Sequence, residues 1–255
     1  MIYKLHSLNN DFLISDQILE PLSQNSKVLC ERKTGFGADG LICYKLSEKS
    51  DKQAIIHAYL NNFDGSSASF SGNGFSCLAK LIFLLNEDLD TLVIHCNKYT
   101  FNVRKSSSST VLTLNHYQNI NEKYSNSTIH EKNTCFHIDV GNEHAIIFDS
   151  RPSKYVESHF ESLENYPNSI NVDFVEIMDA STIALDVIER GCGRTQACSS
   201  AALASTIVGH ENGLLKLPVR VQQKGGNCIV SKNKNNYEIT LNPVLIGKVE
   251  YEFKQ

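Results

Sequence analysis

Two short stretches decide the fold of this chain: residues 189–201, which read ERGCGRTQACSSA, and residues 71–75, which read SGNGF. Each follows a strand-like segment, passes through a turn of small residues and opens a helical pattern. Cys198 lies 127 residues after Ser71, about half of the 255-residue chain. The spacing predicts two structurally similar halves with one such helix each, although a chance match of two small-residue segments would also explain it.

The rest of the chain is dominated by period-two and short apolar runs, which predict strands. The runs cover residues 1–5, 12–16, 40–46, 54–60, 91–96, 99–103, 110–115, 135–140, 144–149, 172–178, 183–189, 219–222, 227–231 and 237–241. The clearest helical patterns span 73–85 and 198–208, and weaker ones lie near 16–26 and 153–166. The chain is therefore expected to be a strand-rich mixed α/β protein.

A polar segment, residues 117–134, separates the two halves and is where we place the domain crossover. We expect an N-terminal half of residues 1–116, joined by a C-terminal strand at 245–255, and a C-terminal half of residues 117–244. The run SSSST at 106–110 stands between two strand-like segments and predicts a hairpin loop.

Composition excludes several classes of protein. With 41% hydrophobic and 20% charged residues the chain is not a disordered tail, and a net charge of −4 without a basic block argues against nucleic-acid binding. The longest apolar stretches, such as 78–85, fall far short of a membrane span. The N-terminus lacks the pattern of a secretory signal, so we expect a cytoplasmic protein.

Cofactor and metal signatures are weak. The stretch 35–40 fits the G-x-G-x-x-G pattern, but charged residues precede it and a strand-like run follows, so it predicts a glycine-rich turn and no dinucleotide site. The nine histidines form no H-x-x-x-H pair, and the eight cysteines form no C-x-x-C pair. We therefore expect no metal site, and free thiols that are mostly buried.

Residues 189–201 carry the chemistry. A strand end and a glycine turn lead to Cys198, a thiol at the opening of a helix. Free backbone N–H groups at a helix N-terminus attract a carboxylate, and the same dipole end lowers the pKa of a cysteine toward the thiolate. Such a site suits removal of a proton beside a carboxylate. The alternative is a buried structural cysteine beside a packing helix.

The motifs along the chain resemble those of the diaminopimelate epimerase family. Leu8–Phe12 resembles the family's G-N-D-F, and RKTGFGADG at 32–40 resembles R-x-T-G-x-G-x-D-G. Further matches, in chain order, are NFDGS at 62–66, SGNG at 71–74 (C-G-N-G in the family), GNEH at 141–144, Asn171 before Phe174, residues 189–198, and the Gly-Gly pair at 225–226. Each match is weak alone, but eight in order are strong.

The resemblance implies an α/β (α+β) fold of two pseudo-symmetric domains, each a mixed β-sheet or barrel wrapped around a central helix, with the site in the cleft between them. It implies an isomerase that converts LL- to meso-diaminopimelate in lysine and cell-wall synthesis, without pyridoxal phosphate or another cofactor. It also implies a homodimer whose partner is the amino-acid substrate. With the composition and the N-terminus considered above, we expect this homodimer in the cytoplasm, with no nucleic-acid or membrane partner.

The resemblance also assigns roles to residues. Cys198 is one acid/base group, and Ser71 stands at the position of the other. The amides of Gly72, Asn73, Ser199 and Ser200 are the candidates for holding the reacting carboxylate, whose developing charge needs stabilisation. The matches to the group that holds the second amino-acid head of diaminopimelate are Asn10, Asn62, Asn142, Asn171, Glu189 and Arg190. For any single asparagine, a turn or cap role is the alternative.

Ser71 departs from the family, which has cysteine there, and a hydroxyl is a far poorer base than a thiolate. Three explanations stay open: an introduced Cys-to-Ser change, a divergent enzyme that works with one base on this or another amino acid, or a chain that binds its ligand without turnover. Arg194 replaces a usual Glu, Ser199 and Ala201 replace glycines, and residues 75–76 replace a small residue and an arginine, which would suit a different amino-acid substrate.

Overall fold

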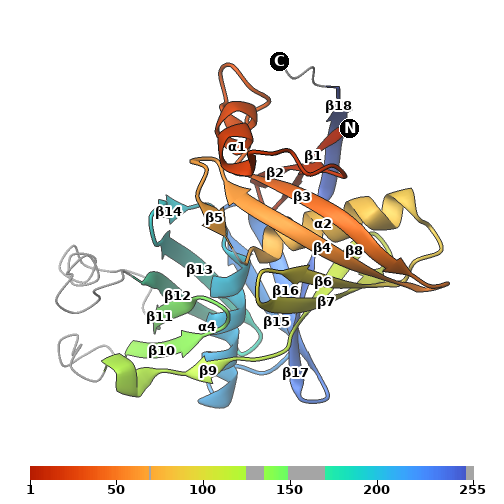
Figure 1. Cartoon of the computed structure of the whole chain (residues 1–255). Coiled ribbons are helices and arrows are strands. Elements are labelled where there is room, and N and C mark those ends of the chain that lie inside the picture. Colours follow the sequence, from red (N-terminus) through yellow and green to blue (C-terminus); the bar gives the residue numbers. More distant parts are fainter. Residues whose placement is uncertain (69, 125–134, 149–169, 251–255) are drawn as a thin grey trace. The chain divides into compact units, whose positions relative to one another are not determined.

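The computed structural model describes residues 1–68, 70–124, 135–148 and 170–250 (Figure 1). The chain divides into two compact units. Unit 1 combines Met1–Thr113 with Thr240–Gln255, and unit 2 is Leu114–Ile239. The two units are described one at a time below.

The described residues of unit 1 form two helices, the first eight strands of the chain and its last described strand. Its elements are β1 (Ile2–Ser7), β2 (Asn10–Ser15), α1 (Leu22–Cys30), β3 (Gly40–Lys49), β4 (Gln53–Asn62), β5 (Ser67–Ala68), α2 (Gly72–Leu85), β6 (Thr91–Cys96), β7 (Tyr99–Ser106), β8 (Ser109–Leu114) and β18 (Val244–Val249).

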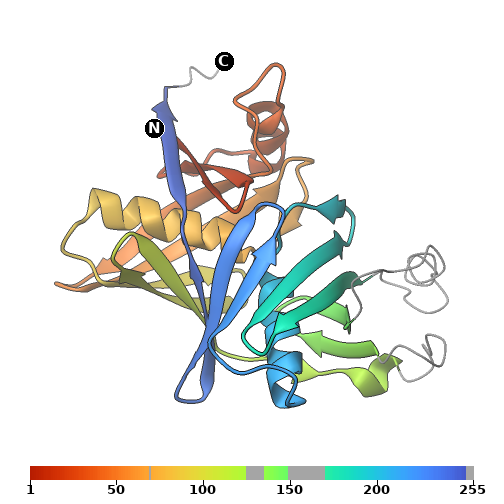
Figure 2. The ribbon, with the colours of Figure 1, turned by 180° about the vertical axis from the view of Figure 1, so that it is seen from behind.

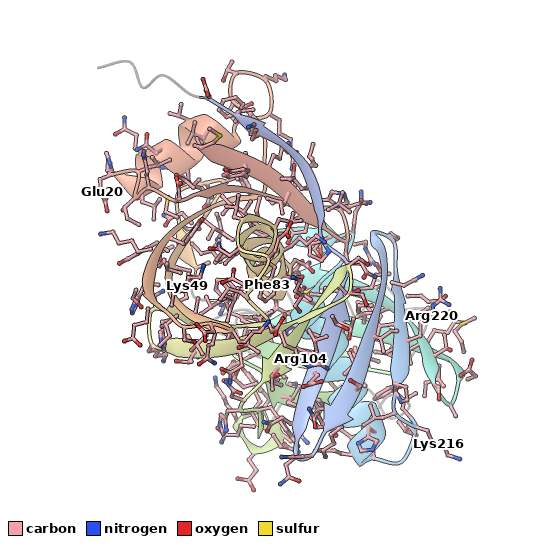
Figure 3. The ribbon with its side chains drawn as sticks, turned by 90° about the vertical axis from the view of Figure 1, so that its right-hand side faces the viewer. Glu20, Lys49, Phe83, Arg104, Lys216 and Arg220 are labelled. Carbon is pink, nitrogen blue, oxygen red and sulfur yellow. The ribbon has the colours of Figure 1, made fainter. Side chains whose placement is uncertain are left out.

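The sheet of unit 1 alternates antiparallel and parallel pairs. β1 is antiparallel to β2 and to β18, β2 is parallel to β3, β3 is antiparallel to β4, β4 is parallel to β6, and β6 is antiparallel to β7. Helix α2 contacts β1, β2, β3, β7 and β18. Figure 3 views this unit nearly along the axis of α2, with curved strands around the helix on which Phe83 is labelled.

The amino-acid pattern of α2 explains why it lies inside. A helix that is apolar on all sides is stable only when it is buried on all sides. Cys77, Leu78, Ala79 and Phe83 point in different directions around α2, and each is at most 4% exposed. Ser71 starts the helix, since its hydroxyl oxygen accepts a hydrogen bond from the backbone N–H of Gly74 at 3.0 Å.

Unit 2 is built from a similar set of strands around one long helix. Its elements are β9 (Gln118–Asn119), the 3-10 helix η1 (Asn121–Tyr124), β10 (Cys135–Asp139), β11 (Glu143–Ile147), β12 (Asn171–Asp179), β13 (Thr182–Glu189), β14 (Gly193–Thr195), α4 (Ser199–Glu211), β15 (Val219–Gln223), β16 (Gly226–Asn233) and β17 (Asn236–Leu241).

The pairings of unit 2 follow the same order as those of unit 1. β10 is antiparallel to β11, β11 is parallel to β12, β12 is antiparallel to β13, β13 is parallel to β15, and β15 is antiparallel to β16. Helix α4 contacts β10, β11, β12 and β16, and Figure 2 shows strands of this sheet in front of it. Its small residues, among them Ala201, Ala202 and Ala204, are fully buried.

The repeat extends to the short strands and the helices. β5 pairs antiparallel with β4 just before α2, and β14 pairs antiparallel with β13 just before α4. The expected fold, two pseudo-symmetric halves with a mixed sheet around a central helix, is confirmed. The equivalence of the stretches that begin at Ser71 and Cys198 therefore reflects architecture and is no chance match.

The expected helix at 16–26 is wrong in its position. The helix α1 begins at Leu22, and Pro21 precedes it with an extended backbone (φ −74°, ψ 124°). A proline lacks the N–H that a helix interior needs and disfavours helical backbone in the residue before it, so a helix cannot run through position 21. The weak helical pattern at 153–166 lies outside the described residues.

Several local expectations are confirmed. The glycine-rich stretch 35–40 is irregular backbone with bends at Gly35 and Asp39, and it leads from the turn at 32–34 into β3. A Cβ at Gly35 would lie only 2.3 Å from the carbonyl oxygen of Val28, so the chain passes too close there for any other residue. The hairpin at 106–110 joins β7 to β8. All eight cysteines are free, and six of them are buried.

Among the residues that the structure describes, no helix has the length and apolar character that crossing a membrane requires. In the same part of the chain, no three His, Cys, Asp or Glu side chains gather in a way that would hold a metal ion.

Candidate active site

In unit 1 the predicted site residues lie at the ends of β2 and β4 and at the start of α2. Asn10 opens β2 and donates from Nδ2 to Asp39 Oδ2 at 2.8 Å. Asn62 closes β4 and donates from Nδ2 to the hydroxyl of Ser66 at 2.9 Å. Each side-chain amide thus donates one hydrogen bond to the protein through Nδ2. Neither of these two hydrogen bonds involves the Oδ1 acceptor.

A charged cluster holds Asn10 in place. Arg32 binds both carboxylate oxygens of Asp11 at 2.8 and 3.2 Å and reaches Asp39 at 2.7 Å, and Lys4 lies 3.0 Å from Asp11. Burial alone would raise the pKa of Asp11, but the hydrogen bonds from Arg32 and Lys4 lower it below its usual value. The cluster joins the N-D-F motif to the glycine-rich turn.

The N-terminus of α2 completes this part of unit 1. Gly74 packs against Phe12 of β2 and Ile42 of β3, where a Cβ would come within 3.0 to 3.2 Å of both side chains. Asn73 is 3% exposed, and its Oδ1 has no hydrogen-bond partner. A buried unsatisfied acceptor is costly and calls for an explanation, such as a ligand.

In unit 2 the predicted residues converge on the N-terminus of α4. Cys198 is the N-cap residue of this helix, and its Sγ lies 3.1 Å from the Oγ of Ser200. Asn142 donates to the same Oγ at 3.2 Å. The thiol of Cys198 also lies close enough to Glu189 for the carboxylate charge to act on it.

Asn171 and Arg190 belong to the same group. The side chain of Asn171 donates to the carbonyl oxygen of Glu143 at 2.8 Å, and its Oδ1 accepts the backbone N–H of Arg190 at 3.0 Å. Both ends of this amide are used by the backbone. Asn171 therefore fixes the backbone at Arg190. The motifs, in contrast, predict that the side chain of Asn171 contacts the substrate directly.

Arg194, a departure from the resemblance near the thiol, is paired with a neighbour. Its guanidinium forms an ion pair with Asp186 on the adjacent strand β13. The positive charge is thus compensated within the sheet. Ser199 and Ser200 open α4 and are buried, as expected for residues whose amides begin a helix.

Comparison with known proteins agrees with this arrangement. The diaminopimelate epimerase of Rickettsia africae (strain ESF-5) is 31% identical over 268 residues, covering 99% of this chain and 97% of the relative. That of Rickettsia akari (strain Hartford) is 33% identical over 269 residues, with the same coverage. The chain belongs to the diaminopimelate epimerase family. This confirms the resemblance read from the motifs.

A sequence profile described as diaminopimelate epimerase matches residues 136–251, which include Cys198 and its surroundings. Among solved structures, a predicted epimerase of Pseudomonas aeruginosa superimposes with a TM-score of 0.72 over 99% of each chain at 11% identity. At that identity the likeness shows the fold alone. The profile therefore supports the family, and the solved structure supports the mixed α/β fold.

One expectation about this member of the diaminopimelate epimerase family is wrong. The helix N-terminus was expected to lower the pKa of Cys198, but the structure raises it well above the usual value. Burial is the largest cause, followed by the negative charge of Glu189, while the hydrogen bond with Ser200 acts the other way. The helix end does not outweigh desolvation of a thiol that is 5% exposed.

The motifs of this family member did not predict that His144 and Asp173 form a buried pair. His144 Nδ1 lies 3.0 Å from Asp173 Oδ1, and His144 Nε2 lies 3.1 Å from Ser200 Oγ. His144 ends the GNEH motif, which was the available signal. No sequence motif marks Asp173, because this residue comes next to His144 only through the parallel pairing of β11 with β12.

Proposed function

We propose that the protein is a cofactor-independent amino-acid epimerase that converts LL-diaminopimelate to meso-diaminopimelate. The observation that carries the proposal is the position of Cys198 as N-cap residue of α4 in a member of this family. A thiol there stands beside backbone N–H groups that have no acceptor within the helix. It is suited to exchange a proton at a Cα atom whose carboxylate those amides hold.

The division of roles follows the family resemblance. Cys198 removes or returns the Cα proton, and Ser71 marks the position of the second acid/base group. The amides of Gly72, Asn73, Ser199 and Ser200 would stabilise the negative charge that moves onto the carboxylate when the proton leaves. No pyridine ring is then needed as an electron sink.

The remaining side chains would recognise the second amino-acid head. Asn10, Asn62 and Glu189 offer oxygen acceptors that suit an ammonium group, and Arg190 suits a carboxylate because of its two-pronged geometry. Asn142 and Asn171 would act through their neighbours, since Asn142 binds Ser200 and Asn171 binds the backbone of Arg190.

The experiment is incubation of LL-diaminopimelate with the protein in heavy water, followed by chiral separation and mass spectrometry. Meso product that carries deuterium at Cα is expected. L-lysine is the matched control substrate because it keeps the distal ammonium and lacks the distal carboxylate, and it should react far more slowly. Absence of both deuterium and meso product would overturn the proposal.

A one-base enzyme is the second candidate, favoured by one observation. The hydroxyl of Ser71 accepts the N–H of Gly74 and so acts as a helix cap. Deuterium at Cα without inversion in the same experiment would support this alternative, while binding of the ligand without any exchange would indicate a binding protein.

We also propose a cytoplasmic homodimer, as the family resemblance implies. Sedimentation equilibrium on the purified full chain should give twice the 28.5 kDa mass of one chain. A single species at the mass of one chain would contradict the dimer.

A further inference from the structure

A cavity on unit 1 lies outside the proposed site. Its volume is about 320 Å³, and it lies between the last two turns of α2 and the hairpin that joins β7 to β8. Ligand pockets in proteins start at about this size. Lys80, which lines the cavity, follows Ser71 by nine residues along the same helix, or about 14 Å along its axis. The cavity is therefore distinct from the predicted acid/base position at Ser71.

The cavity has an apolar wall. Phe83, which is labelled in Figure 3, is 4% exposed, whereas its neighbour Leu84 is 46% exposed. An exposed leucine on its own needs no explanation. This one lies beside a hollow, so a small apolar group placed there would cover it and remove apolar surface from water.

Two ammonium groups are fixed at the cavity. Lys80 Nζ donates to the carbonyl oxygen of Ser108 at 3.0 Å, and Lys105 Nζ donates to that of Glu87 at 3.1 Å. These bonds join α2 to the hairpin, and β7 to the segment after α2. An ammonium group has three N–H donors, so each lysine keeps two beyond its carbonyl bond. Among the residues that the structure describes, neither lysine is paired with a carboxylate.

The SSSST stretch at 106–110 places two hydroxyl groups at the same cavity. Ser109 donates its O–H to Asn242 Oδ1 at 2.5 Å, which leaves Ser107 to donate to a ligand. Ser107 has a φ of 51°, a left-handed backbone that glycine adopts without strain. Serine at this position of the turn adds a hydroxyl that glycine would lack.

The charges of the lining determine which ligand charge it suits. The lining contains Lys80, Lys105 and one carboxylate, Glu87, so its net charge is +1. The C-terminus of a helix carries partial negative charge, but the carbonyl oxygen of Ile82 already accepts the backbone N–H and the Nδ2 of Asn86, at 2.9 and 3.1 Å. A ligand with one negative charge complements this lining, and Glu87 would repel a second.

We propose that this cavity binds a monocarboxylate with a short aliphatic chain. Lys80 and Lys105 donate charge-assisted hydrogen bonds to the carboxylate, Ser107 adds a hydroxyl donor, and the chain lies against Phe83 and Leu84. The proposed function assigns both carboxylates of its substrate to other residues, so this is an additional site. It does not depend on the proposed function.

The test is a titration of the full chain with hexanoate, followed by NMR through the backbone amide signals of residues 107–109. These signals should shift and reach saturation. Hexylamine and 1-hexanol are the matched probes, because they keep an unbranched chain of similar length and replace the carboxylate by a cation or a neutral group. Each should bind at least about fivefold more weakly than hexanoate, since the contacts that it loses are charge-assisted.

Two substitutions test the ammonium groups one at a time. Lys80→Gln and Lys105→Gln each remove a charge and keep an N–H donor for the carbonyl bond, so the hairpin should stay in place. Each should weaken hexanoate binding by roughly fivefold, because the attraction between opposite charges at a partly buried site is lost. Lys98→Gln is the matched control, since Lys98 is exposed just before β7 begins and should leave the dissociation constant unchanged.

Glu87→Gln should act in the opposite direction. Without this carboxylate the net charge of the lining rises to +2. Hexanoate should then bind more tightly, by roughly two- to fivefold, while hexylamine should bind more weakly. A change of the same sign for both ligands would trace the effect to the shape of the cavity and contradict the assigned pattern of charges.

Three results would overturn the proposal: the absence of saturable shifts at residues 107–109 with hexanoate, binding of hexylamine as tight as that of hexanoate, or equal effects of Lys98→Gln and the two lysine variants of the cavity. Shifts that gather instead at residues 72–74 and 199–201 would place the carboxylate at the helix N-termini and count against this site. None of these results bears on the proposed function, whose test is deuterium exchange at Cα.

Discussion

Residue 71 and residue 198 hold equivalent places in the two units. Each is the N-cap residue of a central helix with an extended backbone, at φ −151° and ψ 108° for Ser71 and φ −135° and ψ 119° for Cys198. Their side chains differ in chemistry. Position 71 therefore has the backbone of an acid/base site and a side chain that is a poor base.

Replacement of Ser71 by cysteine should increase conversion of LL- to meso-diaminopimelate by roughly 10²-fold or more, the usual contribution of a positioned acid/base group. The rate is measured by chiral chromatography. Ser76→Cys is the matched control, because it adds a thiol to the same helix at a buried position beyond its first turn. An unchanged rate in Ser71→Cys would argue against a broken acid/base pair.

At the scale of elements, Asp11 joins the start of β2 to the turn that follows α1. Because its pKa in the folded chain is lowered, the carboxylate stabilises the fold above its ordinary pKa of 3.8, and this contribution is lost as the pH falls further. Asp11→Asn should therefore be less stable at neutral pH, and the difference from the wild type should shrink below about pH 4.

Urea unfolding of both proteins across this pH range checks the prediction. A difference in the free energy of unfolding that stays constant from neutral to acidic pH would show that the charge of Asp11 does not stabilise the fold, and would contradict the prediction.

A second prediction concerns the contact between β15 and α4. Gln223, at the end of β15, accepts the backbone N–H of Cys198 at 2.8 Å. Gln223→Leu leaves that N–H without its acceptor and should lower the free energy of unfolding by about 1–3 kcal/mol. Gln222→Leu is the matched control, since neighbouring residues of a strand face opposite sides. Equal losses in the two variants would contradict the assigned role.

Which elements could be predicted depended on their length and surroundings. The long strands and both central helices were found because burial on one face, or on all faces, leaves a periodic apolar pattern. The strands β5 and β14 are too short to show a period. The start of α1 was misplaced because a weak helical pattern at residues 16–26 runs across Pro21, and a helix interior does not accept a proline there.

At the scale of the whole molecule, the repeat of strand pairings explains why one short sequence stretch has a counterpart half a chain away. Motif order predicted the family and assigned Cys198, Ser200 and Asn142 to the site in three different roles, and the structure joins them by hydrogen bonds. The sequence could not predict the raised pKa of Cys198. Burial arises from the packing of β11, β12 and β16 on α4, which no local pattern contains.

The central claim is that Cys198 exchanges the Cα proton of an amino-acid substrate. The most direct test is the initial rate at which deuterium from heavy water enters Cα of LL-diaminopimelate, compared between the wild-type chain and Cys198→Ser. The wild type should incorporate deuterium, and Cys198→Ser should be slower by roughly 10²-fold or more. Equal rates in the two proteins would contradict the account.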